Sequence, residues 1–145
     1  MVTPDGISAE DWERVHELAV EILNADEEES EGYRTRLLDY LYSLEEKYGE
    51  LPSILATRSD YTNDLRLKER LLARAYGLAM ARGDDRNALY IAHSLAELSV
   101  EEFRDAKEGY KWLDCVKQHL SQVDDSWFAE EYDRLRHALQ QLPPE

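Results

Sequence analysis

Residues that cross-link or interrupt a chain are scarce in this sequence. Its 145 residues include one cysteine, four prolines and six glycines. A single cysteine, Cys115, excludes an internal disulfide and a zinc site built from several thiolates. No apolar run approaches the ~20 residues that a membrane-spanning helix needs. Met1 to Asp11 lack the basic and apolar regions of a secretory signal, so we expect a cytoplasmic protein.

Sequence motifs that carry catalytic chemistry are missing as well. There is no Gly-rich phosphate loop, no Gly-x-Ser-x-Gly turn and no His-Glu-x-x-His metal motif. Three helical pairs, Glu13 with His16, His93 with Glu97 and Cys115 with His119, each offer only two metal ligands. We therefore expect no enzymatic activity, no cofactor and no metal.

Basic residues are outnumbered by acidic ones, 17 to 32, and the formal net charge is −15. Nucleic acids and anionic membranes recruit proteins through Lys and Arg, so this balance argues against both as partners. It would instead attract a basic protein. The same charge could equally serve only to keep the protein soluble.

Helical periodicity fills the rest of the chain. Apolar residues recur three and four positions apart in seven segments, and helix start and stop signals separate them. Ser99 and Glu102 form a Ser-x-x-Glu capping box that is predicted to open the sixth segment. The segments are expected near residues 8–23, 33–48, 52–61, 64–82, 84–98, 99–116 and 124–139. The chain is therefore predicted to be all-α.

Three tyrosines, Tyr42, Tyr76 and Tyr110, recur at a spacing of 34 residues. That spacing is the period of a two-helix repeat. In such an array each hairpin buries one face against the previous one, so we expect these rings at equivalent, buried points of successive hairpins. The surrounding residues repeat too: Leu37, Leu38, Leu44 and Gly49 recur as Leu71, Leu72, Leu78 and Gly83.

The patterns Leu72-x3-Tyr76-x2-Ala79 and Ala106-x3-Tyr110-x2-Leu113 resemble tetratricopeptide repeats over residues 31–120. The resemblance implies antiparallel hairpins stacked in a right-handed superhelix, with a concave groove that binds peptides or protein segments without catalysis. The single domain 1–145 would then comprise an N-terminal helix and acidic turn (1–30), the hairpins (31–120), and a capping helix with a tail (121–145).

A basic stripe is the first candidate binding surface. Arg66, Arg70 and Arg74 are spaced to share one helical face, and Arg58 lies in the short helix before them. Together with Tyr76 and Tyr110 they are predicted to contact a partner, because Arg binds carboxylates through two N–H groups. Alternatively, these arginines pair with acids of neighbouring helices.

An acidic patch is the second candidate. It comprises Asp26, Glu27, Glu28, Glu29 and Glu31. It could dock a basic protein, or it could be a solvated turn whose carboxylates stabilise the start of the next helix.

These features favour a non-enzymatic protein-interaction module, present as a monomer or weak homodimer, that binds a peptide or protein segment in a helical groove. The alternative is an acidic inhibitor, such as a bacterial immunity protein that neutralises a basic toxin.

Overall fold

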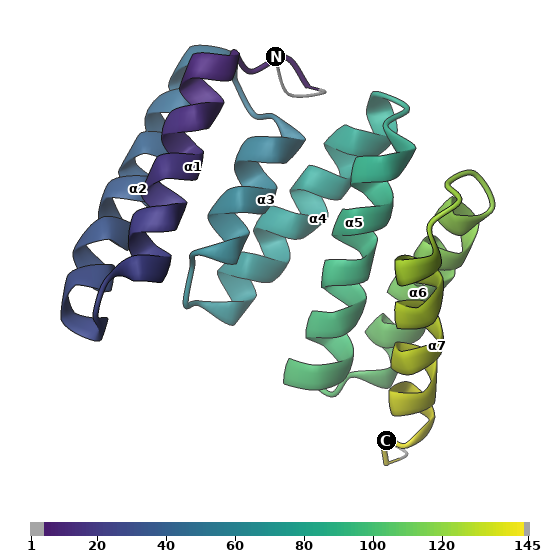
Figure 1. Ribbon diagram of the computed structural model, residues 1–145. Coiled ribbons are helices and arrows are strands. Elements are labelled where there is room, and N and C mark those ends of the chain that lie inside the picture. The colour runs from purple at the N-terminus through teal and green to yellow at the C-terminus, as the bar shows by residue number, and fades with distance from the viewer. Residues whose placement is uncertain (1–4, 144–145) are drawn as a thin grey trace. The chain divides into compact units, whose positions relative to one another are not determined.

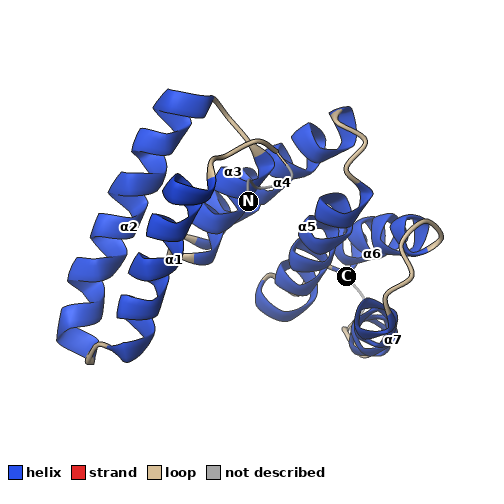
Figure 2. Cartoon of the chain, turned by 45° about the horizontal axis from the view of Figure 1, so that its top comes forward, coloured by secondary structure: helices blue, strands red, loops and turns tan. Residues whose placement is uncertain are grey.

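The computed structural model describes residues 5–143, and these are helical almost throughout (Figure 1). The described residues form seven α-helices and one short π-helical turn, η1, and they contain no strand (Figure 2). The all-α prediction is confirmed. None of these helices is both long and apolar enough to cross a membrane. Their bounds are α1 Ala9–Asn24, α2 Glu27–Tyr48, α3 Pro52–Asp60, α4 Leu65–Ala81, α5 Asp85–Glu97, η1 Leu98–Glu102, α6 Ala106–Leu120 and α7 Ser126–Gln140.

Local capping residues set most of these ends. The sequence predicted the starts near Ser8 and Asp84, but it placed the start of the second helix near residue 33, whereas α2 begins at Glu27. The side chains of Ser8, Asp26 and Asp84 accept hydrogen bonds from backbone N–H groups in the first turns of α1, α2 and α5. Gly49 and Gly83 follow α2 and α4 with φ of 84° and 67°, where other residues are strained.

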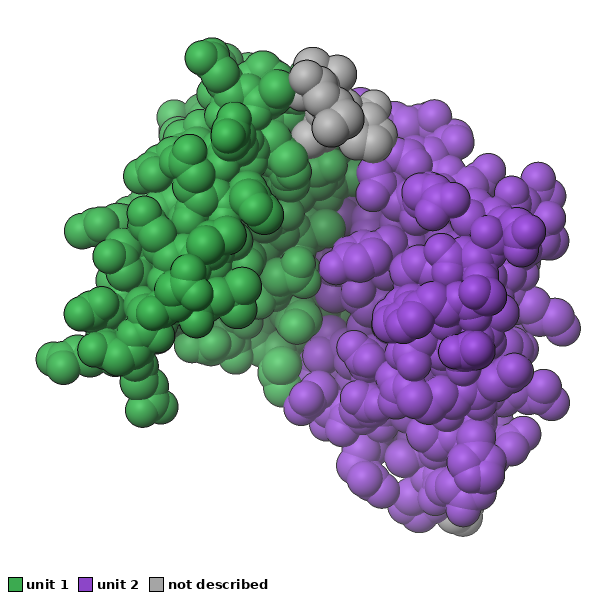
Figure 3. Space-filling view, viewed as in Figure 1, with its two compact units in different colours: residues 1–71 green, residues 72–145 purple. Residues whose placement is uncertain are grey.

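The chain divides into two compact units, residues 1–71 and 72–145, and the division falls inside α4 (Figure 3). Each unit has its own buried residues, and each is described separately below. The right-handed superhelix, the single-domain organisation and its three predicted segments stay predictions.

In the first unit, α1 and α2 lie side by side as an antiparallel hairpin, and α3 packs against α2. A polar contact aligns the hairpin: the Asp11 carboxylate, near the start of α1, accepts from Lys47 Nζ at 2.8 Å and from the Tyr48 hydroxyl. The core of this unit is apolar and comprises Ile7, Val15, Leu18, Leu37, Leu41, Leu44, Leu51 and Ile54.

In the second unit, α5 and α6 form the hairpin, and α7 packs on both. Gly109 lets α7 approach α6 closely, because a Cβ added there would lie 2.9 Å from Leu139 Cδ1 and 3.1 Å from Val100 Cγ2. The buried side chains of this packing include Leu89, Ile91, Leu95, Trp112, Leu113, Val116, Leu135 and Leu139.

The predicted capping box at Ser99 is wrong. Leu98 and Val100 are both buried, and the chain stays helical through them as the π-helical turn η1. The Ser99 carbonyl accepts from the Asp105 N–H instead, and the chain reverses at Arg104, whose φ is 51°. Asp105 then caps α6 by accepting from the N–H of Glu108.

The expectation of equivalent, buried tyrosines is also wrong. Tyr42 is 58% exposed and Tyr110 52%, whereas Tyr76 is half-buried. On α6 the buried stripe runs through Gly109, Trp112, Leu113, Val116 and His119. Tyr110 directly follows Gly109, so it lies about 100° around the helix from that stripe. Tyr42 stands in the same relation to the buried Leu41 of α2.

Candidate functional site

A hollow of about 150 Å³ opens in the first unit. Helix α2 contributes one wall, α3 and the turn after it a second, and the first turns of α4 the third. The lining residues are Leu38, Asp39, Tyr42, Arg58, Thr62, Leu67 and Leu71. Three leucines make the hollow largely apolar, and the exposed Tyr42 ring brings an aromatic face to it.

Arg58 is held firmly at this hollow. Its Nη1 donates to Glu45 Oε2 at 2.8 Å, and its guanidinium carbon lies 5.2 Å from the centroid of the Tyr42 ring. The Arg58 side chain is only 19% exposed. An arginine carries five N–H donors, so this single ion pair leaves donors for a bound ligand.

The charge at the hollow differs from the predicted carboxylate clamp. Glu45 already neutralises Arg58, which is the internal pairing that the sequence left open as an alternative, and Asp39 adds an exposed carboxylate. A second carboxylate from a ligand would therefore be poorly stabilised here. An apolar side chain fits the leucine walls better.

The other predicted arginines lie elsewhere. Arg66 pairs with Glu69 across one helical turn at 3.1 Å and is well exposed. Arg70 is exposed on α4, and Arg74 lies on the part of α4 that belongs to the second unit. None of these three lines the hollow, so the structure brings only Arg58 of the predicted basic residues into it.

In the second unit, Tyr76 belongs to a hydrogen-bonded chain. Its hydroxyl lies 2.8 Å from His119 Nε2, and His119 Nδ1 lies 3.3 Å from Asp85 Oδ1. Burial, followed by a hydrogen bond with Cys115, raises the pKa of Tyr76 well above its ordinary value. The phenol therefore stays protonated and serves as a packing and hydrogen-bonding group, with its ring edge-on to Trp112 at 5.2 Å.

The acidic patch occupies the beginning of α2. Asp26 is the N-cap, and Glu31 pairs with Arg34. Glu27, Glu28 and Glu29 are exposed in the first helical turn, where the helix dipole stabilises negative charge. These three carboxylates have no basic partner among residues 5–143, so they remain available to a basic protein.

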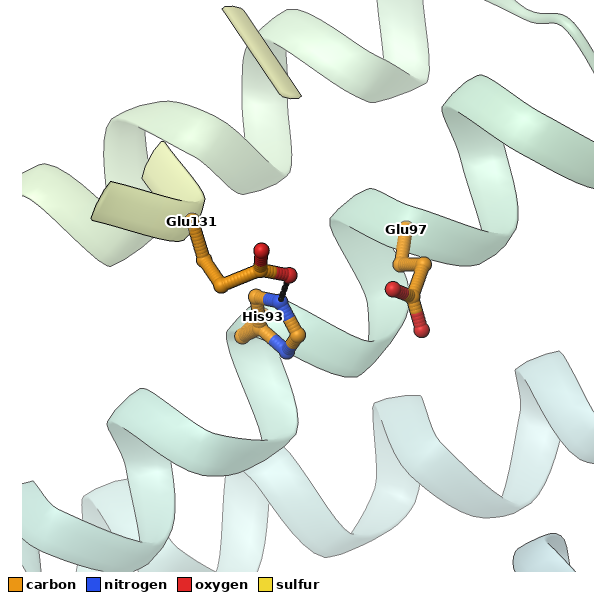
Figure 4. A group of neighbouring side chains, drawn as sticks. All are labelled: His93, Glu97 and Glu131. Carbon is orange, nitrogen blue, oxygen red and sulfur yellow. Dashed lines mark hydrogen bonds and ion pairs between the residues drawn. The ribbon is translucent and has the colours of Figure 1, made fainter. Parts of the chain in front are cut away.

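A network of charged side chains joins α5, η1 and α7. His93 Nε2 lies 2.8 Å from Glu131 Oε1, and Glu97 is one turn further along α5 (Figure 4). Arg134 donates to Glu131 at 2.8 Å, to Glu97 at 2.9 Å and to Glu101. Hydrogen bonds from Arg134 and then His93 hold the pKa of Glu131 at about 2.

The sequence pairs His93 only with Glu97, because periodicity reveals partners within one helix. Glu131 is 38 residues away and arrives only when α7 packs against α5. The one available signal was the Glu131 and Arg134 pair, spaced to meet on a single helix face. Of the other two-ligand pairs, Glu13 and His16 are exposed on α1. His119 is engaged with Tyr76 and Asp85.

No protein-family model, curated protein or solved structure matches this chain. Its function must be argued from the two sites themselves.

Proposed function

We propose that the chain is a non-enzymatic protein-interaction module whose hollow in the first unit receives a large apolar side chain of a partner segment. The observation that carries the proposal is the Tyr42 and Arg58 pair beside an apolar hollow. Tyrosine and arginine are enriched at the positions that dominate protein–protein binding energy.

The size of the hollow suits one anchor residue. A dry cavity of about 150 Å³ lined by apolar side chains accommodates a benzene-sized group. A leucine or phenylalanine side chain therefore matches the space between Leu38, Leu67 and Leu71. Glu45 holds Arg58 in position before binding, so little side-chain entropy remains to be lost when its free N–H groups bond a partner carbonyl.

The resemblance to tetratricopeptide repeats supports the same role, since such hairpins present grooves to peptide segments. Within this proposal the protein acts in the cytoplasm as a monomer or weak homodimer. Its proposed role requires no catalysis.

The alternative, an acidic inhibitor of a basic protein, has its own observation in its favour. Glu27, Glu28 and Glu29 project from the start of α2 without basic partners among the described residues. The net charge of −15 would speed the approach of a basic toxin.

Peptide selection distinguishes the two functions. A displayed random-peptide library is selected on the full-length chain, and the enriched peptide is titrated by fluorescence anisotropy at low and high salt. For the interaction module we expect peptides with a large apolar residue, whose affinity Tyr42→Ala and Arg58→Gln each reduce by about tenfold or more. Arg70→Gln is the matched control, because it removes the same charge from an exposed site outside the hollow.

The proposal is wrong if no peptide is enriched, or if Arg70→Gln weakens binding as much as Arg58→Gln does. Basic peptides that are released by salt would favour the inhibitor instead. In that case the affinity for basic peptides should fall in the triple variant Glu27→Gln, Glu28→Gln and Glu29→Gln. Tyr42→Ala should leave it unchanged.

A further inference from the structure

Three potential metal ligands converge in the second unit, whereas the hollow that carries the proposed function belongs to the first. They are one imidazole nitrogen of His93 and one carboxylate oxygen each of Glu97 and Glu131, and all lie within 4.8 Å of one another (Figure 4). His93 and Glu97 are one helical turn apart on α5, and Glu131 faces them from α7.

The spacing of these atoms is close to that of a metal centre. A tetrahedral Zn²⁺ ion holds its ligands at about 2.0–2.2 Å, which places them about 3.4 Å apart. The largest separation within the set would have to shorten by at most about 1.4 Å, and the half-exposed Glu97 side chain has room to move. The fourth position would belong to water or to Glu101, which follows Glu97 by one turn.

The charge of the network favours a dication. Glu97, Glu101 and Glu131 contribute three negative charges, and Arg134 supplies one positive charge in their midst. With the imidazole neutral, as metal ligation requires, two negative charges remain uncompensated. A single divalent ion would balance them.

Arg134 is compatible with a bound ion. Each carboxylate offers about four lone-pair sites. Arg134 Nη2 donates to Glu97 Oε2 at 2.9 Å and to Glu131 Oε1 at 2.8 Å, the oxygen that also faces His93 Nε2, so an ion would use the remaining lone pairs of these carboxylates. Carboxylates that ligate metals are commonly hydrogen-bonded in this way by an outer ring of residues. Arg134 then acts as the positioning residue of the site.

The surroundings of His93 also favour ligation. The residue is 6% exposed, and its ring packs against Trp127 and Phe128 at centroid distances of 5.3 and 5.4 Å. These contacts fix the ring with Nε2 directed at Glu131, so little reorganisation is needed on binding.

From these observations we propose that His93, Glu97 and Glu131 bind one divalent transition-metal ion that joins α5 to α7. One imidazole with carboxylates suits Zn²⁺ better than Mg²⁺, which prefers an all-oxygen, octahedral set.

Isothermal titration calorimetry of the tag-free, chelator-treated full chain tests the site, with ZnCl₂ and MgCl₂ as probes. We expect one Zn²⁺ per chain, a higher melting temperature in the presence of zinc, and much weaker binding of Mg²⁺. Loss of an outer hydrogen-bond partner typically costs 10–100-fold in metal affinity, so loss of a ligand in Glu97→Gln, Glu131→Gln or His93→Asn should cost at least about tenfold.

Matched controls come from the same helix. Glu130→Gln and His137→Asn alter exposed residues of α7 outside the cluster, and they should leave zinc affinity unchanged. Because His93 is buried, His93→Asn can impair folding and lower zinc affinity indirectly. The Glu97 side chain is 44% exposed, so Glu97→Gln should leave the fold intact and is the variant that tests zinc ligation directly. Absence of zinc binding, or binding that a folded Glu97→Gln variant retains in full, would overturn the proposal.

Discussion

At the scale of single residues, the three tyrosines spaced 34 residues apart lie in two different environments. Tyr76 bonds His119 and packs on Trp112, whereas Tyr42 and Tyr110 are more than half exposed. The 34-residue spacing therefore does not predict how much each ring contributes to stability. A ring contributes to stability through the neighbours that it touches.

Truncation should separate these tyrosines. Tyr76→Ala removes an aromatic contact and a buried hydrogen bond, and we expect the free energy of unfolding to fall by about 3 kcal/mol. Tyr110→Ala, 34 residues further along the chain, should change it by less than about 0.5 kcal/mol because the ring is exposed. Urea unfolding of both variants measures the difference. Equal losses would show that the two positions are equivalent after all.

Asp11 should make the first unit sensitive to acid. Hydrogen bonds from Lys47 and then Tyr48 lower its pKa from 3.8 to about 2. A carboxyl group with a lowered folded-state pKa contributes its full stabilisation above its unfolded pKa and loses it as the pH falls through the folded value. Thermal unfolding between pH 5 and 2 should therefore show a loss of stability below about pH 4 that is smaller in Asp11→Asn.

Glu10→Gln is the control for this measurement, because Glu10 is an exposed neighbour on the same helix. A pH profile that Asp11→Asn leaves unchanged would contradict the assignment.

At the scale of helices, Gly109 decides how closely α7 packs on α6. Glycine is a poor helix former, so its place in the first turn of α6 is explained by the contact with Leu139 and Val100. Leu139 is 2% exposed and has little room to rotate away, and the β-branched Val100 is stiff.

Alanine substitutions at two helical glycines should have opposite effects. Gly109→Ala should lower the free energy of unfolding by about 1 kcal/mol or more, because overpacking exceeds the gain in helix propensity. Gly32→Ala in α2, where an added Cβ meets nothing within 4 Å, should raise it by up to about 1 kcal/mol. Denaturant midpoints of the two variants check this, and a stabilised Gly109→Ala would refute the packing argument.

At the scale of the whole molecule, charge is the dominant feature. With 32 acidic against 17 basic residues, like charges repel across a small surface. Exposed ion pairs such as Arg14 with Glu17 offset little of this, because solvent screens them.

Salt should therefore stabilise the protein. Raising NaCl to about 0.5 M shortens the screening length to about 4 Å, and we expect the melting temperature to rise by about 2–4 °C. Scanning calorimetry at low and high salt measures the shift. In the triple variant with glutamine at Glu27, Glu28 and Glu29, the melting temperature should rise less with salt. A melting temperature that falls with salt would mean that attraction between ion pairs outweighs repulsion between the acidic residues.

The sequence by itself determined the helices and most of their ends. Caps at Ser8 and Asp84 and stops at Gly49 and Gly83 act within a few residues, so local patterns reveal them. The cap at Asp26 was missed, because the acidic stretch after it was interpreted as a turn. It also included Arg58 among the candidate partner contacts, because a locally basic stretch in an acidic chain is visible without a fold.

Only the tertiary structure decided which helix faces are buried, and therefore what each site contains. The hollow needs leucines from α2 and α4 around Arg58, and the His93 network needs Glu131 from a helix 38 residues away. The turn at Ser99 likewise continues α5 because Leu98 and Val100 are buried by packing. Such contacts join residues distant in the chain, and local periodicity carries no information about which distant faces meet.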